Sequence, residues 1–170
     1  MHTRYTVIDT VLGPVTVVAR GEALVGLYFE EHVRRPAQET LGPHIPAAAD
    51  GLFADAAGQL HDYLAGRRTA FALPLAPAGD DFQHAVWALV DAVPRGSTTT
   101  YGAIARRLGD PHLAQRVGQA VGSNPLCILI PCHRVVGADG SLTGYAGGLP
   151  RKRALLDLEE PPEVTATRLF

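Results

Sequence analysis

The chain has 170 residues, of which 46% are hydrophobic and 19% are charged, and its formal net charge is −2. This composition is typical of one globular domain or two small ones, and it excludes a disordered chain. No stretch offers the roughly 18 consecutive apolar residues of a membrane helix, and the first residues lack the apolar core of a secretion signal. We therefore expect a cytoplasmic protein without a membrane partner.

Charge is distributed unevenly along the chain. Residues 1–94 carry 6 basic and 11 acidic side chains, residues 95–153 carry 8 basic and 2 acidic, and residues 154–170 carry 1 basic and 4 acidic. The middle segment, with its net charge of +6, favours an anionic partner such as nucleic acid. An ordinary solvated surface would have the same composition.

Three short runs rich in β-branched and aromatic residues open the chain, at Tyr5–Thr10, Pro14–Ala19 and Leu24–Phe29. Glycine and proline residues separate these runs, so the pattern predicts three strands in an antiparallel meander. A proline-rich stretch over residues 31–50 predicts a surface loop. Apolar residues then recur at helical spacing from Gly51, which predicts a helix that ends near Gly66.

Turn-forming residues with few charges mark 73–81 as a linker. We therefore expect an N-terminal domain over 1–72, a C-terminal domain over 82–160 and a tail over 161–170.

The second domain begins with three predicted helices. The first is capped by Asp80 or Asp81 and ended by Pro94, and Trp87 lies off its apolar stripe, where it would pack against a neighbouring element. The second follows Thr98–Thr100 and stops at Gly109, and the third runs from Pro111 to Gly122. Two short helices joined by a tight turn indicate a helix-turn-helix, although any corner of two helices has this pattern.

The third predicted helix has a small, polar face formed by Gln115, Gly118, Gln119 and Gly122. Such a face allows close approach to a DNA groove, and equally to a neighbouring helix. Beyond it, Leu126–Ile130 reads as a buried strand that Pro131 ends, because proline cannot continue a ladder of hydrogen bonds.

The two cysteines, Cys127 and Cys132, lie five residues apart in one segment and do not indicate a disulfide framework. The seven histidines are scattered, so we expect no metal site. Cys132 is followed directly by His133. A thiol is nucleophilic as its thiolate, and a neighbouring imidazole favours that form, but a buried inert cysteine is the common alternative.

The sequence Ile130-Pro-Cys-His-Arg-Val135 is preceded by Asn124-Pro125 and followed by Gly144-Tyr-Ala-Gly-Gly148. Together with Arg151-Lys152, Leu155-Leu156 and Glu159, this string resembles the O6-alkylguanine-DNA alkyltransferases. The resemblance is strong over residues 80–160 and loose in the N-terminal region. It implies an α/β (α+β) fold, with a small antiparallel sheet and a helix of RNase H-like type, then a mostly helical, winged-helix-like domain with a helix-turn-helix.

The resemblance also implies an activity. Family members reverse DNA damage directly by moving an alkyl group from O6 of guanine to their own cysteine, irreversibly and once per molecule, after the base is flipped out. It makes Cys132 the acceptor, with His133 and Glu159 as a relay that deprotonates it through a water molecule. Asn124 would brace the active-site turn, and Tyr101 would donate a hydrogen bond to guanine N3. The reaction implied by the resemblance uses no metal and no organic cofactor. Whether O4-alkylthymine is also repaired stays open.

The remaining expected contacts also come from the resemblance. The pocket for the base would be formed by Val135, Tyr145, Ala146 and Gly147, with Cys127 as a wall residue. The helix-turn-helix would enter the minor groove of double-stranded DNA through Gly118, Gln119 and their neighbours. Candidate phosphate contacts are Arg95, Arg106, Arg107 and Arg151. Arg134 would be a structural ion-pair partner, and the protein is expected to act as a monomer, with cooperativity on DNA left open.

One position departs from the family pattern. Members place an arginine where Gln115 stands, and that arginine fills the space left by the flipped base. Arg116 is one residue further, and one residue turns a helix by about 100°, so Arg116 cannot simply replace it. We expect either Gln115 to act as the wedge or a local rearrangement to bring Arg116 inward.

Three alternatives come from other classes of protein. A non-catalytic relative that only binds alkylated DNA would lack the reactive cysteine. A thiol hydrolase would need an oxyanion hole and a direct Cys-His geometry that adjacent residues rarely offer. A helix-turn-helix regulator would need a face that reads the major groove and an element for dimerisation, and the sequence shows neither.

Overall fold

The computed structural model describes residues 2–161. The chain forms two compact units, Met1–Ala78 with Pro125–Leu129, and Gly79–Asn124 with Ile130–Phe170. The five residues Pro125–Leu129 therefore pack with the first unit, whereas the sequence placed them in the second domain. None of the helices in the described part of the chain is long and apolar enough to span a membrane.

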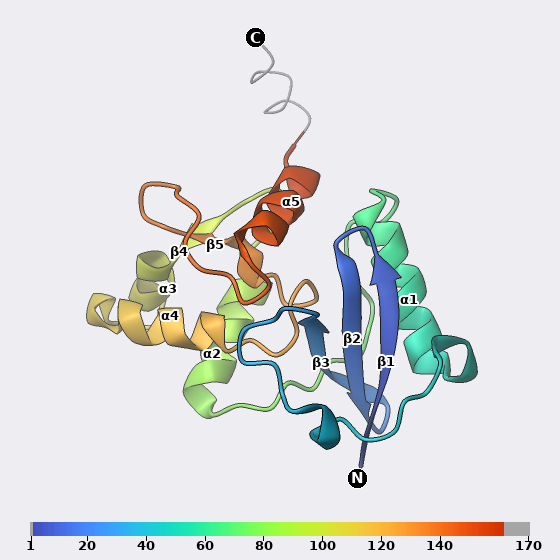
Figure 1. The fold of residues 1–170 in the computed structure, drawn as a ribbon. Helices are drawn as coiled ribbons and strands as arrows, with labels where there is room; N and C mark the ends of the chain where they lie inside the picture. Colours follow the sequence, from blue (N-terminus) through green and yellow to red (C-terminus); the bar gives the residue numbers. More distant parts are fainter. Residues whose placement is uncertain (1, 162–170) are drawn as a thin grey trace. The chain divides into compact units, whose positions relative to one another are not determined.

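The first unit is built on an antiparallel sheet of three strands, β1 (Thr3–Thr10), β2 (Gly13–Arg20) and β3 (Ala23–Phe29), in that order (Figure 1). The central strand, β2, is buried over five successive residues, as expected for a strand covered on both faces. The turns before and after β2 use Gly13 and Gly21 at positive φ. The predicted meander is confirmed.

Helix α1 (Gly51–Leu64) packs against this sheet (Figure 1) and confirms the helix predicted from Gly51. Asp50 caps it by accepting hydrogen bonds from the N–H groups of Leu52 and Phe53. The same carboxylate binds Arg4 of β1 at 2.6 Å, which ties the start of the helix to the sheet. The preceding loop contains two short 3₁₀ turns, Gln38–Thr40 and Ala47–Ala49.

The outer edge of β3 is covered by two single bridges rather than by a strand. Leu75 pairs with Leu24, which places part of the predicted linker on the sheet, and Leu126 pairs with Leu27. The Leu27 N–H donates to the carbonyl of Pro125 at 2.8 Å. These bridges occupy edge groups that would otherwise be open to another chain.

The strand predicted over Leu126–Ile130 is wrong, because only Leu126 pairs and the residues that follow form a turn. Ile128 adopts φ 71° there, a left-handed conformation that is strained for a β-branched residue. The side-chain amide of Asn124 donates to the carbonyl of Ile130 at 2.9 Å and so closes the loop. An apolar run alone does not separate these outcomes, since all five residues are buried in this turn as they would be in a strand.

The described part of the second unit contains four α-helices and a small parallel sheet (Figure 1). They are α2 (Asp81–Asp91), α3 (Tyr101–Arg107), α4 (Ala114–Gly122) and α5 (Leu149–Glu159), with β4 (Thr99–Thr100) paired to β5 (Val135–Val136). The third predicted helix is divided into a 3₁₀ turn at Pro111–Leu113 followed by α4.

Local sequence signals set the boundaries of these helices. Asp80 and Gln83 form a reciprocal capping box at the start of α2. Thr100 caps α3 by accepting from the N–H of Ala103 at 3.0 Å. Trp87 is buried and its Nε1–H donates to the carbonyl of Ala120 at 2.8 Å, so it joins α2 to α4 as the sequence predicted.

Candidate active site

Cys132 follows a tight turn that Asn124 supports. The N–H of Cys132 donates to the carbonyl of Ile130 at 2.7 Å across Pro131, which has φ −80° and ψ 62°, the values of an inverse γ-turn. The same carbonyl accepts the hydrogen bond from Asn124, itself 2% exposed. Cys132 then begins a 3₁₀ turn, Cys132–Arg134, and its side chain is buried. The turn thus fixes the direction in which the thiol leaves the backbone.

His133, Arg134 and Glu159 form one buried network. Glu159 Oε2 lies 2.8 Å from His133 Nε2, and the Arg134 guanidinium donates to both oxygens of Glu159, at 2.8 and 3.0 Å. Arg134 also donates to the carbonyl of Val93 at 2.7 Å. Arg134 is therefore an internal ion-pair partner, as the sequence predicted, and Glu159 brings the end of α5 to the active-site turn.

The network fixes which nitrogen of His133 carries the proton. Glu159 is paired with Arg134 as a carboxylate and can only accept, so Nε2 of His133 must donate to it. Burial lowers the pKa of His133 and outweighs the opposing effect of Glu159, which favours the neutral ring. Nδ1 is then a free base, and it is buried without a hydrogen-bond partner among the described residues.

Lys152 is a second buried cation beside the site. Its Nζ donates to the carbonyls of Val135 at 2.7 Å, Thr143 at 2.9 Å and Gly144 at 3.4 Å, and the residue is fully buried. Burial lowers the pKa of Lys152, whereas the charge of the Cys132 thiolate raises it. Lys152 therefore holds the loop that follows β5 and places a positive field near the thiol.

The predicted substrate residues lie on β5 and on the loop before α5. Val135 is buried and its carbonyl is bound by Lys152. Tyr145, Ala146 and Gly147 form a turn in which the N–H of Gly148 donates to the carbonyl of Tyr145 at 2.9 Å. Tyr101, the first residue of α3, has its hydroxyl 2.8 Å from the hydroxyl of Thr143 in the same loop. The structure thus joins Tyr101 to the loop through Thr143, a residue that the sequence did not single out.

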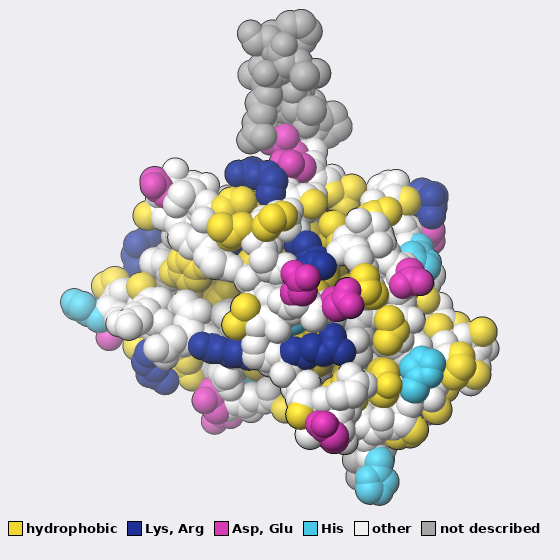
Figure 2. Space-filling model, in the orientation of Figure 1, with side chains coloured by type: hydrophobic (Ala, Val, Ile, Leu, Met, Phe, Trp, Pro, Cys, Tyr) yellow, Lys and Arg dark blue, Asp and Glu magenta, His cyan; other side chains and the backbone are white. Residues whose placement is uncertain are grey.

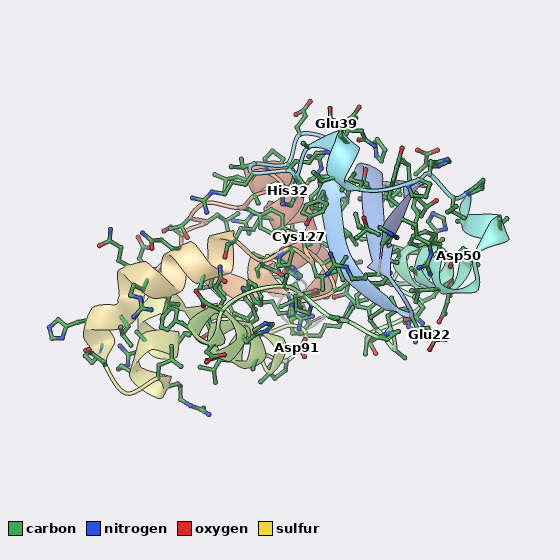
Figure 3. All side chains as sticks on the ribbon, turned by 90° about the horizontal axis from the view of Figure 1, so that it is seen from below. Glu22, His32, Glu39, Asp50, Asp91 and Cys127 are labelled. Carbon is green, nitrogen blue, oxygen red and sulfur yellow. The ribbon has the colours of Figure 1, made fainter. Side chains whose placement is uncertain are left out.

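Cys127 lies in the first unit, beside His32 (Figure 3). Its sulfur is 4.0 Å from Nε2 of His32, whose Nδ1 accepts a hydrogen bond from the N–H of Phe29 at 3.2 Å. Cys127 is 1% exposed. These contacts are those of a packed thiol, and the role of Cys127 as a pocket wall stays a prediction.

The predicted DNA-binding residues on α4 are mostly at the surface. Gln115 and Gln119 are exposed and Gly118 is partly exposed. Arg116 is exposed too, and its guanidinium lies 4.0 Å from the centre of the Phe82 ring, a cation-π contact with the start of α2. Arg116 is thus held on Phe82, so the rearrangement that would bring it to the wedge position is absent from this structure.

Two arginines predicted to contact phosphate make contacts within the second unit. Arg95 donates to the carbonyl of Leu158 at 3.1 Å, near the C-terminal end of α5. Arg151 donates to the carbonyl of Gly147 at 3.0 Å. Both are partly buried, whereas Arg106 and Arg107 are exposed. Within residues 2–161, no cluster of three or more His, Cys, Asp or Glu residues could hold a metal ion.

Comparison with known proteins decides the family. Residues 81–161 match the family model for the DNA-binding domain of 6-O-methylguanine DNA methyltransferase, and residues 3–77 match the ribonuclease-like domain of the same enzyme. A methylated-DNA–protein-cysteine methyltransferase from Mycobacterium tuberculosis is 44% identical over 98% of both chains. The chain belongs to the 6-O-methylguanine DNA methyltransferase family.

Similarity to other members supports the assignment to this methyltransferase family. A methylated-DNA–protein-cysteine methyltransferase from Methanosarcina barkeri is 41% identical over 92% of this chain and 96% of its own. The crystal structure of Mycobacterium tuberculosis OGT in complex with DNA superposes with a TM-score of 0.83, at 44% identity and 92% coverage of both chains. The expected α+β fold with a helical second domain is confirmed.

Sequence reasoning assigned no role to Lys152 or Thr143. Lys152 could have been found, because it stands three residues before Leu155 and seven before Glu159, on the one buried stripe of α5. A lysine on such a stripe needs buried acceptors. Thr143 carries no comparable signal, since its contact with Tyr101 spans 42 residues.

Proposed function

We propose that this protein repairs alkylated DNA by moving an alkyl group from O6 of guanine to the sulfur of Cys132, once per molecule. The observation that carries the proposal is the buried pair Cys132 and His133 on a braced turn, with His133 bonded to the buried Glu159 at the end of α5, in a chain of this family. Relatives of high identity are named methylated-DNA–protein-cysteine methyltransferases, and one is solved with DNA. No metal or organic cofactor takes part in the proposed reaction.

Activation of the thiol follows from the tautomer of His133. Nε2–H donates to Glu159, so the unprotonated Nδ1 accepts the thiol proton through a water molecule. Glu159 then stabilises the imidazolium that forms. The buried ammonium of Lys152 favours the thiolate, because a nearby positive charge stabilises the charged form of a cysteine.

The transfer itself is a single displacement. The thiolate sulfur of Cys132 forms a bond to the alkyl carbon while the bond from that carbon to O6 breaks, and the electron pair passes to the purine. The base becomes guanine when it gains a proton, so the thiol and the O6-alkylguanine yield a thioether and guanine. No step regenerates the thiol, and the protein is consumed.

The other site residues have supporting roles in the proposal. Tyr101 donates to N3 of the flipped base and stabilises the charge that develops on it. Val135, Tyr145, Ala146 and Gly147 surround the base, and α4 enters the minor groove with Gln115 at the position of the wedge. The exposed, small face of α4 supports this placement. We propose that the protein acts as a monomer, with one protomer sufficient for repair of one lesion.

Intact mass spectrometry tests the reaction. After incubation with a duplex containing one O6-methylguanine, the wild-type protein is expected to gain the mass of one methyl group, in proportion to the lesion supplied. Cys132→Ser should gain none. Cys127→Ser is the matched control, because it removes the other buried thiol, and it should gain one methyl group as the wild type does.

The outcomes separate the alternatives. Lesion binding without any mass gain would identify a non-catalytic binder, and methyl transfer to Cys127 would show that the acceptor is misassigned. Release of free methanol with an unmodified, reusable protein would indicate a hydrolase.

A further inference from the structure

We infer that Thr143 is a positioning residue for the transfer, acting through the Tyr101 hydroxyl; this rests on the proposed function. Thr143 Oγ1 lies 2.8 Å from the Tyr101 hydroxyl oxygen, and either atom can be the donor in the free protein. Thr143 belongs to the loop between β5 and α5, and Tyr101 is the first residue of α3. The hydrogen bond therefore links the helix-turn-helix to the loop that covers the base.

Backbone contacts hold the segments that carry Tyr101 and Thr143. Tyr101 follows β4, in which Thr100 pairs with Val136 of β5, and Thr100 also caps α3. The backbone carbonyl of Thr143 accepts a hydrogen bond from the buried Lys152 at 2.9 Å. A separate backbone contact therefore holds each segment in place, with the two hydroxyl groups 2.8 Å apart.

The chemistry of a hydroxyl determines the direction of the bond during the reaction. A phenol has one proton to donate and can also accept. When Tyr101 donates to the purine, its proton is used, so Thr143 must then donate to the phenol oxygen. A hydrogen bond accepted by the phenol strengthens the one that the phenol donates. Thr143 thus directs the Tyr101 proton toward the base and makes it a better donor.

A double-mutant cycle tests this inference by single-turnover kinetics, with protein in excess over a duplex containing O6-methylguanine. Thr143→Val removes the hydroxyl at nearly constant shape and is expected to lower the limiting rate about 2- to 10-fold, as for one neutral hydrogen bond. The half-saturating protein concentration should stay unchanged. Thr143→Ser should restore the rate, and Thr98→Val, at an exposed threonine, should leave it unaltered.

The Tyr101→Phe background distinguishes positioning from packing. Without the phenol hydroxyl, Thr143→Val should have no further effect on the limiting rate. An equal loss in both backgrounds, or no loss in either, would overturn the inference. If wild-type protein gains no methyl group, the proposed function itself fails; if it does and the cycle is additive, only the role of Thr143 fails.

Discussion

At the scale of single residues, the site depends on a neutral histidine held between buried charges. The ring of His133 is fully buried, which lowers its pKa, whereas the neighbouring Glu159 raises it and the charge of Arg134 adds to the lowering. Burial therefore prevails and lowers the pKa of His133. The consequence is a base that stays unprotonated at neutral pH, with its free nitrogen set by the hydrogen bond on the other side.

This lowered pKa predicts how stability depends on pH. The unfolded chain binds a proton at His133 below its ordinary pKa of 6.5, whereas the folded protein does so only at lower pH. The contribution of His133 to stability is thus complete above that value and is lost as the pH falls toward the lower folded-state pKa. Urea unfolding measured at a series of pH values should show this loss in the wild type.

Two variants isolate the contribution of His133. The loss below pH 6.5, the ordinary histidine value, should be smaller in His133→Gln, which cannot be protonated. The control is His112→Gln. The side chain of His112 is 95% exposed, so this variant should show the same dependence of unfolding free energy on pH as the wild type. Identical profiles for His133→Gln and the wild type would show that this residue is not kept neutral by the fold.

At the scale of elements, α5 and α4 have different roles in the proposed reaction. One face of helix α5 is buried and carries Lys152, Leu155 and Glu159. This face places a cation and an anion in the same site. Helix α4 buries Val117, Ala120 and Val121 and leaves Gln115 and Gln119 outside. In the proposed reaction, α5 therefore supplies buried charged groups to the active site, and α4 supplies an exposed face for DNA.

The exposed position of Gln115 leads to a prediction about base flipping. Gln115→Arg is expected to raise the single-turnover repair rate and to tighten binding to lesion-containing duplex, because a longer charged side chain fills the space that the flipped base leaves. Glutamine and arginine have similar helix propensities, so α4 should be undisturbed. Arg116 does not supply this function while it stacks on Phe82.

Gln119→Arg is the matched control. It adds the same charge one helical turn further along the exposed face of α4. An equal increase in repair rate and in affinity in the two variants would show a general electrostatic effect. No increase in Gln115→Arg would contradict the assignment of the wedge position.

At the scale of the whole molecule, the basic segment over residues 95–153 is less available than its net charge of +6 suggests. Arg134 and Lys152 are buried, and Arg95 and Arg151 donate to backbone carbonyls. On the face that Figure 2 draws, the basic side chains of the whole chain lie mostly apart from one another, with acidic ones beside several of them. The exposed pair Arg106 and Arg107 is then the best candidate for phosphate contacts.

The salt dependence of DNA binding tests this assignment. Arg106→Gln and Arg107→Gln should each weaken binding to any duplex and reduce the slope of log affinity against log salt concentration by about 1. Arg20→Gln removes an exposed arginine from β2 and should leave the slope unchanged. Equal effects of all three substitutions would mean that net charge, and not a contact at α3, controls the affinity.

The sequence by itself determined the meander, α1, the capped helices and the family motif around Cys132, because periodicity, caps and turn residues are local signals. It also found Arg134 as an internal partner. Tertiary structure alone decided the rest. Leu126–Ile130 forms a turn and not a strand because the Asn124 side chain donates a hydrogen bond to the carbonyl of Ile130. The apolar pattern does not distinguish the two, since these residues are buried in either case. Contacts such as Lys152 with Val135 and Tyr101 with Thr143 depend on where the chain returns in space, which no local pattern records.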